Sequence, residues 1–183
     1  MIGLLGGAFD PPHRGHVALA DAAEHQLGLD EVVVVVVASP GHKAVHSSAE
    51  TRCRLARLAF PGRRVELDRH ERTVDMLRAG PWLDPVFLVG ADEFADFPAW
   101  KEPDAVLELA RLGVGSRPGY PRERLDLVRQ RLGRPDRVLF FEFDAIDVSS
   151  NEIRDRIGRG EPIDGLVPPA VAADIAEHRL YRG

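Results

Sequence analysis

The sequence predicts an α/β protein whose parallel sheet is covered by helices on both faces. Strand-like and helix-like apolar patterns alternate along the whole chain, an order that favours parallel strands joined by helical crossovers. Val32 to Val37 is a run of consecutive valines, which suits a central strand that is buried on both faces. In such a sheet, ligands gather at the carboxyl ends of the strands. The loops after Leu5, Val37, Val89 and Val114 are therefore the places to search for a site.

The individual elements follow from these patterns. Strands are expected at Ile2 to Leu5, Val32 to Val37, Val65 to Leu67, Val86 to Val89, Leu112 to Val114 and Val138 to Phe141. Helices are expected from about Gly15 to Gly28, and at Ala49 to Ala59, Asp104 to Arg111, Arg122 to Leu132, Asn151 to Arg159 and Pro169 to His178. In the first of these helices, helical spacing turns Val17, Ala20, Ala23 and Leu27 inward.

Length and composition narrow the class of protein. We expect one domain over residues 1–183, because the chain is too short for two ordinary domains. The longest apolar run, Val32 to Ala38, falls well short of the roughly 20 residues that cross a bilayer, so no membrane span is expected. No secretory leader is visible, and a cytoplasmic location is the default.

The net charge of −5 argues against a broad nucleic-acid surface. The single cysteine, Cys53, is expected to fill the core rather than to react.

The loop after the first strand carries the strongest chemical signal. It reads Gly6-Gly7-Ala8-Phe9-Asp10-Pro11-Pro12-His13-Arg14-Gly15-His16. Glycines let backbone N–H groups approach a phosphate closely, and the following helix directs its positive dipole end to the same place. The loop matches neither the GxGxxG fingerprint nor the GxxxxGK[ST] loop, so it predicts a phosphate cradle of another kind.

His13 and His16 are three residues apart at the start of the helix and can face one ligand together. They would supply N–H donors, or positive charge, to oxygens that gain charge in a transition state. Two other interpretations remain open. The pair could bind a metal with a third ligand from elsewhere, or both histidines could cap the loop structurally.

The run Gly7-Ala8-Phe9-Asp10-Pro11-x-His13-x-Gly15-His16 resembles the signature of the HxGH nucleotidyltransferase superfamily. The resemblance implies a Rossmann-like, doubly wound fold and a reaction at the α-phosphate of a nucleoside triphosphate that uses Mg²⁺ and releases pyrophosphate. It also implies that ATP is bound by Gly6, Gly7, Ala8, Phe9, His13 and His16. Mg²⁺ would be held mainly by substrate phosphates and water, as that ion prefers.

A second segment, Val148 to Arg154, resembles the ISSTxIR motif of the same superfamily, with Asn151 where Thr is usual. Ser149 and Ser150 are N-cap candidates for a helix, and Arg154 lies one turn further along the same face. The resemblance implies that these three residues bind ATP. The alternative is a capped surface helix with an exposed arginine.

Smaller features resemble the nicotinate-nucleotide adenylyltransferases of bacteria along nearly the whole chain. Pro40-Gly41-His42-Lys43 matches their PPHK turn, Gly90-Ala91-Asp92 and Trp100-Lys101 match their GAD and WK elements, and Arg117-Pro118-Gly119 matches their RPG turn. The resemblance implies that Lys43 and Arg117 contact ATP phosphates, with Lys43 joining His13, His16 and Arg154 as catalytic residues. Asp92 would bind ribose hydroxyls or cap a helix. Trp100 would stack on a pyridine ring or belong to the core.

One stretch departs from that family. Where its members have Ser-Tyr-Thr near the nicotinate carboxylate, this chain has Glu71-Arg72-Thr73, so Thr73 is kept and Arg72 replaces the tyrosine. The function hypothesis is transfer of AMP from ATP to nicotinate mononucleotide, giving deamido-NAD and pyrophosphate. The alternatives are transfer to nicotinamide mononucleotide or to phosphopantetheine, and a non-catalytic nucleotide-binding regulator built on the same fold.

Overall fold

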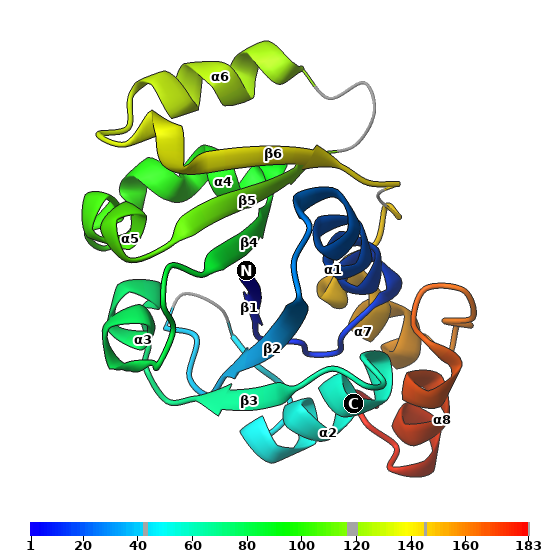
Figure 1. Cartoon of the computed structure of the whole chain (residues 1–183). Coiled ribbons are helices and arrows are strands. Elements are labelled where there is room, and N and C mark those ends of the chain that lie inside the picture. Colours follow the sequence, from blue (N-terminus) through cyan, green and yellow to red (C-terminus); the bar gives the residue numbers. More distant parts are fainter. Residues whose placement is uncertain (42–43, 117–120, 145, 183) are drawn as a thin grey trace.

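A sheet of six strands forms the centre of the molecule, in the order β3-β2-β1-β4-β5-β6 (Figure 1). The computed structural model describes residues 1–41, 44–116, 121–144 and 146–182. The strands are β1 (Ile2–Gly7), β2 (Glu31–Val37), β3 (Val65–Asp68), β4 (Val86–Gly90), β5 (Arg111–Ser116) and β6 (Val138–Glu142). All neighbouring strands are parallel. Each predicted strand is therefore confirmed.

Helices cover the sheet on both faces. They are α1 (Arg14–Leu27), α2 (Ala49–Ala59), α3 (Thr73–Ala79), α4 (Ala91–Asp96), α5 (Pro103–Leu109), α6 (Arg122–Gln130), α7 (Ser150–Gly158) and α8 (Pro169–Glu177), with short 3₁₀ turns η1 (Phe97–Ala99) and η2 (Pro135–Arg137). In the view of Figure 1, α1, α7 and α8 gather on the right and α3 and α5 on the left. The expected doubly wound, Rossmann-like fold is confirmed.

Two short helices, α3 and α4, were not expected from the sequence. Each is seven residues or fewer, and such a segment has too few turns for helical periodicity to stand out. The predicted helix Asp104 to Arg111 was too long at its end, because Arg111 begins β5 and pairs with Val86 of β4.

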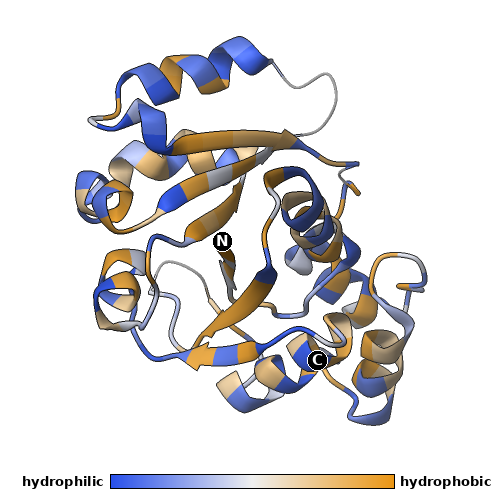
Figure 2. Cartoon of the chain, in the orientation of Figure 1, coloured by the Kyte–Doolittle hydropathy of each residue, from blue (hydrophilic) through white to orange (hydrophobic). Residues whose placement is uncertain are grey.

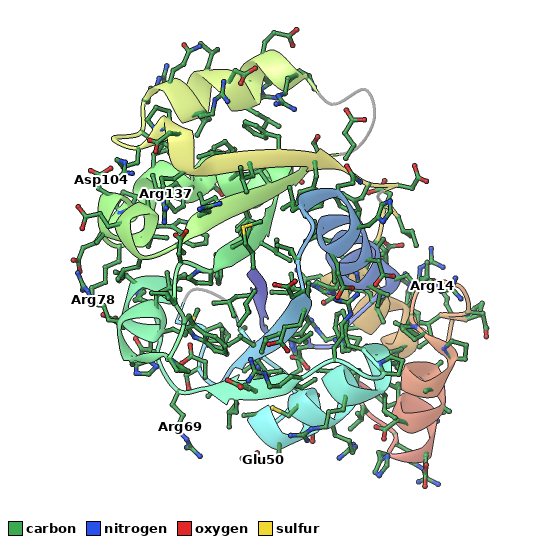
Figure 3. All side chains as sticks on the ribbon, viewed as in Figure 1. Arg14, Glu50, Arg69, Arg78, Asp104 and Arg137 are labelled. Carbon is green, nitrogen blue, oxygen red and sulfur yellow. The ribbon has the colours of Figure 1, made fainter. Side chains whose placement is uncertain are left out.

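The valine run of β2 packs against both layers of helices. Val32, Val34 and Val36 join the cluster formed with α1, α2, α7 and α8, while Val33 and Val35 join the cluster formed with α3 to α6. Side chains alternate between the two faces of a strand, so a strand buried on both faces needs apolar residues throughout. Figure 2 shows β2 as a hydrophobic stripe, and charged side chains such as Arg78 and Asp104 project outward in Figure 3.

The chain's last helix packs on α2. The guanidinium of Arg54 on α2 donates to both carboxylate oxygens of Asp174 on α8, with N···O distances of 3.0 Å. Just before α8, the carbonyl of Leu166 accepts a hydrogen bond of 2.9 Å from the backbone N–H of Arg14. The C-terminal segment therefore braces the start of α1.

The order of the strands places a switch point at β1. The neighbours of β1 are β2 and β4, so the connections after β1 and after β4 leave toward opposite faces of the sheet. A crevice forms where such connections separate, outside the carboxyl ends of the strands.

Two further findings concern the single cysteine and membrane-spanning helices. Cys53 is buried, and burial raises the pKa of its thiol, which makes it a poor nucleophile and a core residue as expected. Within the described ranges, no helix combines the length and the apolar character that crossing a bilayer requires.

Candidate active site

A cavity of about 580 Å³ opens at the carboxyl ends of β1, β2 and β4. Its wall includes the three residues predicted to bind the mononucleotide, Thr73, Asp92 and Trp100. It also includes Gly6, Gly7 and Ala8 from the end of β1. The volume lies within the range of small-molecule sites, roughly 300–1,000 Å³.

Gly6 and Gly7 belong to β1 rather than to the loop after it. A Cβ on Gly6 would lie 2.9 Å from Cζ of Phe87, and one on Gly7 would lie 3.1 Å from Cζ of Phe9. Because neither glycine has a side chain, aromatic rings can pack beneath the cavity. The sequence did not reveal this packing role. Phe9 is only 1% exposed as a whole residue, and its ring packs edge to face against His16 and Phe60.

His13 and His16 lie together at the start of α1, with stacked rings whose centroids are 3.6 Å apart. The backbone N–H of His13 donates to Nδ1 of His16 at 3.2 Å. This bond uses the lone pair on Nδ1, so a neutral His16 carries its proton on Nε2. The bond orients the His16 ring and favours the tautomer that donates from Nε2.

His13 is buried, whereas His16 is half-buried. Burial lowers the pKa of His13 to about 4, so its ring is neutral near pH 7. Its Nδ1 has no hydrogen-bond partner among the described residues. A Cβ on Gly15 would lie 3.0 Å from this same atom, which explains a glycine at that position. His13 can therefore offer a hydrogen bond but not the positive charge that the sequence left open.

The lowered pKa of His13 predicts a pH dependence of stability. The unfolded chain takes up a proton near pH 6.5 and the native chain only near pH 4, so between these values the unfolded state binds more protons. Relative to His13→Gln, the parent should lose about 3 kcal/mol of unfolding free energy as the pH falls from 6.5 to 4. Urea unfolding of both proteins across this range measures the difference. Above about pH 7.5 the difference should stay constant, and a constant difference throughout would contradict the assignment.

The second motif docks on the loop that contains the first. Ser149 is the N-cap of α7, and its Oγ accepts from the N–H of Glu152 at 3.1 Å. Ser150 Oγ donates to the carbonyl of Pro11 at 2.8 Å. Arg154 Nη1 donates to the carbonyl of Asp10 at 2.6 Å. The two motifs are therefore joined directly.

The departure at Asn151 has a visible effect. Its side-chain Oδ1 accepts a hydrogen bond from Nη2 of Arg154. The guanidinium is thus held between Asn151 and the backbone of Asp10, so its direction is restricted before any ligand binds.

Asp10 and Tyr181 form a contact to which the sequence assigned no role. Asp10 is buried, its Oδ1 accepts from the hydroxyl of Tyr181 at 2.7 Å, and its Oδ2 accepts from the N–H of His46. Burial raises the pKa of the Tyr181 hydroxyl, which stays a donor. This contact ties the C-terminal segment and the loop after β2 to the loop after β1. Asp10 lies in the first motif, and an acidic residue among apolar neighbours was the available signal.

The sequence left two roles open for each of Asp92 and Trp100, and the structure bears on both. The N-cap of α4 is Gly90, so Asp92 is not the capping residue and instead lies exposed on the cavity wall. The ring of Trp100 meets Phe87 and Phe97 edge to face, with centroids 6.0 and 5.2 Å apart. It belongs partly to the core and also lines the cavity.

Two cations line the cavity beside Thr73. Lys101 is paired with Asp75, with an N···O distance of 3.0 Å. Arg72 forms no ion pair with any described residue. The predicted phosphate contacts Lys43 and Arg117 lie outside the described residues.

The metal interpretation of the histidine pair needs further ligands. Over the ranges that the structure describes, no group of three or more His, Cys, Asp and Glu side chains could hold a metal ion.

Comparisons with known proteins give a consistent result. Residues 4–156 match the Cytidylyltransferase-like family. The chain is 40% identical, with 99% of each chain covered, to a probable nicotinate-nucleotide adenylyltransferase of Thermus thermophilus. It is 38% identical to one of Bordetella petrii, covering 99% of this chain and 98% of the relative.

Solved structures share the fold. A Plasmodium falciparum nicotinic acid mononucleotide adenylyltransferase complexed with NaAD superimposes with a TM-score of 0.78, covering 98% of this chain and 96% of that one. The same protein complexed with APC gives a TM-score of 0.73. Their identities to this chain are 17% and 16%, so these matches concern the architecture.

Proposed function

The chain belongs to the cytidylyltransferase-like family and, within it, to the nicotinate-nucleotide adenylyltransferases, and from this membership we propose its reaction. It transfers AMP from ATP to nicotinate mononucleotide, giving deamido-NAD and pyrophosphate, and it also runs the reverse reaction. We place it in the cytoplasm.

The observation that carries the proposal is the junction of the two motifs. Arg154 contacts the backbone of Asp10, three residues before His13, and Ala8 of the same loop lines the cavity. A phosphate held between the histidines and Arg154 would therefore lie at the edge of the cavity. This arrangement supports two nucleotides meeting at one loop, with ATP phosphates over the motifs and the mononucleotide in the cavity.

We assign the ATP side to the loop after β1 and the start of α7. His16 donates from Nε2 to an oxygen that gains charge at the α-phosphate, while neutral His13 adds a second hydrogen bond. Arg154 neutralises phosphate charge with its planar fork. Ser149 and Ser150 hold α7 in place, the first by capping and the second through Pro11. Lys43 and Arg117 are proposed to add charge to the same phosphates.

Transfer proceeds by in-line attack of the acceptor's 5′-phosphate oxygen on the α-phosphorus, and the bond to the bridging oxygen of pyrophosphate breaks. The motifs contain no activated Ser, Cys or Lys nucleophile, which favours direct attack over a covalent intermediate. Catalysis then consists of positioning and charge stabilisation. We propose Mg²⁺ as the cation and treat it as part of the ATP substrate, because the described residues supply no cluster of ligands for it.

The proposed preference for an acid substrate rests on one side chain, Arg72, in a cavity that five carboxylates also line. Lys101 is already paired with Asp75, whereas Arg72 lines the cavity with no described ion-pair partner. A guanidinium can bind a carboxylate with two parallel hydrogen bonds, which an amide cannot reproduce. We propose that Arg72 and the backbone beside Thr73 favour nicotinate over nicotinamide.

Trp100→Ala should weaken nicotinate mononucleotide binding about tenfold and leave ATP binding nearly unchanged, because an aromatic face contributes roughly 1 kcal/mol beyond area burial. Trp82→Ala is the matched control. Trp82 also packs against the core cluster of α3 to α6, yet it does not line the cavity. Calorimetric titration of both variants with each nucleotide measures the effect. Equal loss of mononucleotide affinity in both would show that only the core was disturbed.

The proposed reaction is tested by incubating the protein and Mg²⁺–ATP with one acceptor at a time. Nicotinate mononucleotide, nicotinamide mononucleotide and phosphopantetheine are the acceptors, and pyrophosphate release is the measurement. Fastest release is expected with nicotinate mononucleotide. Release with phosphopantetheine alone would overturn the acceptor class, and ATP binding without release with any acceptor would favour a nucleotide-binding regulator.

A further inference from the structure

Arg52 on α2 is an arginine inside the protein, with only 1% of its surface exposed. It lies on the apolar side of the helix next to Cys53 and one turn before Leu55 and Ala56, all of them buried. Burying a charge is costly unless hydrogen bonds and opposite charge compensate. An arginine here therefore needs a reason other than apolar packing.

The guanidinium of Arg52 is bonded entirely to backbone carbonyls. Nη1 donates to Ala8 at 2.9 Å and to Val37 at 2.7 Å, Nη2 donates to Ala38 at 2.7 Å, and Nε donates to Ser47 at 3.1 Å. These carbonyls belong to the loop after β1, to the end of β2 and to the approach to α2. One side chain thus holds three backbone segments together.

No described carboxylate forms an ion pair with Arg52. The nearby buried acid, Asp10, directs its oxygens to Tyr181 and to the N–H of His46 instead. The direct hydrogen-bond partners of the charge are thus carbonyl dipoles, and two of the bonded residues, Ala8 and Val37, line the cavity. The charge lies directly behind the wall of the proposed nucleotide site.

Three of the carbonyls that Arg52 binds, those of Ala8, Val37 and Ala38, lie at the carboxyl ends of β1 and β2, next to the loop after β1 that is proposed to hold the phosphates of ATP. A carbonyl oxygen that faced a phosphate would repel it. Arg52 draws these oxygens away, and because a peptide N–H points opposite to its carbonyl, the N–H of Phe9 points away from Arg52. These bonds hold the loop in one conformation before an anion binds.

We propose that Arg52 is a positioning residue for adenylyl transfer: it fixes the loops after β1 and β2 and supplies a buried positive charge that the polyphosphate of ATP neutralises. This inference rests on the proposed function only in naming ATP as the anion. It predicts that ATP binding and the charge of Arg52 are coupled, although the side chain does not touch the substrate.

Arg52→Gln keeps hydrogen-bond donors without the charge, and Arg52→Lys keeps the charge without the planar fork. The Kd for ATP should rise about tenfold in Arg52→Gln and by less in Arg52→Lys, with adenosine affinity unchanged in both. The matched control is Arg54→Gln, two residues along the same helix. It loses the ion pair to Asp174 and thus some stability, but ATP affinity should remain that of the parent.

Inorganic tripolyphosphate is the second probe, followed by thermal unfolding. It should raise the melting temperature of the parent and of Arg54→Gln, raise it less in Arg52→Lys, and raise it least in Arg52→Gln. Parental ATP affinity in a folded Arg52→Gln or Arg52→Lys protein, or no stabilisation of the parent by tripolyphosphate, would overturn the proposal. These binding measurements need no turnover, so a failure of the proposed acceptor or reaction would be seen separately in the pyrophosphate assay.

Discussion

Replacing His16 by alanine is expected to lower kcat by about 10²- to 10³-fold, the usual loss for one transition-state donor, while the affinity for ATP changes little. The physical reason is the tautomer. Nδ1 of His16 accepts from the backbone of His13, which leaves the proton of a neutral ring on Nε2, the donor that we propose for the reacting phosphate. Initial rates over a range of ATP concentrations measure kcat and KM separately.

Alanine also removes the acceptor for the His13 N–H, so a second variant is needed. In His16→Asn, the side-chain oxygen can replace Nδ1 as acceptor while the donor at Nε2 is lost. This variant should be more stable than His16→Ala and just as slow. His25→Ala, on the exposed last turn of α1, is the control and should keep parental turnover. Turnover within threefold of the parent in both His16 variants would remove His16 from the transition state.

Arg154→Ala should raise the KM for ATP about 10- to 100-fold, with a smaller effect on kcat. A hydrogen bond to a charged group contributes about 1.5–3 kcal/mol, and the proposed contact to phosphate exists both before and during the reaction. Arg154→Lys should recover only part of the loss, because an ammonium cannot reproduce the fork that now spans Asp10 and Asn151. Saturation curves for ATP provide the measurement. Lys43→Ala should shift them in the same direction.

Arg156→Ala is the matched control for Arg154→Ala. Arg156 lies two residues along α7 and pairs with Glu152 one turn earlier on the helix, a type of pair worth only about 0.3–0.5 kcal/mol. Its KM for ATP should equal that of the parent. Unchanged ATP saturation in Arg154→Ala and Lys43→Ala would place both residues outside the site.

Patterns that extend over several turns or strands were readable from the sequence. The valines of β2 predicted a doubly buried strand because both helix layers need apolar partners on it, and the structure has them. The short helices α3 and α4 were missed, since their six or seven residues carry little periodicity and form through packing on their neighbours. Arg111 was assigned to a helix that ends earlier, because a strand start and a helix end look alike over two residues.

The candidate site could likewise be predicted only in part: continuous motifs were readable from the sequence, and contacts between distant segments were not. The loop residues stood in continuous motifs, so their position at the sheet's carboxyl edge could be expected, and the structure brings Arg154 to that loop. Arg52, Asp10 and Tyr181 act through contacts between distant segments, which no local pattern contains. An arginine on the apolar stripe of α2 was nevertheless a visible anomaly, because charged residues are rarely buried without partners.

The acceptor of the AMP group is the central claim, and a direct competition tests it. The protein is given Mg²⁺–ATP with nicotinate mononucleotide and nicotinamide mononucleotide at equal concentrations, and the two dinucleotide products are distinguished by mass. The charge available at Arg72 and the membership of the chain in the nicotinate-nucleotide family predict that deamido-NAD dominates. Predominance of NAD among the products would contradict the account.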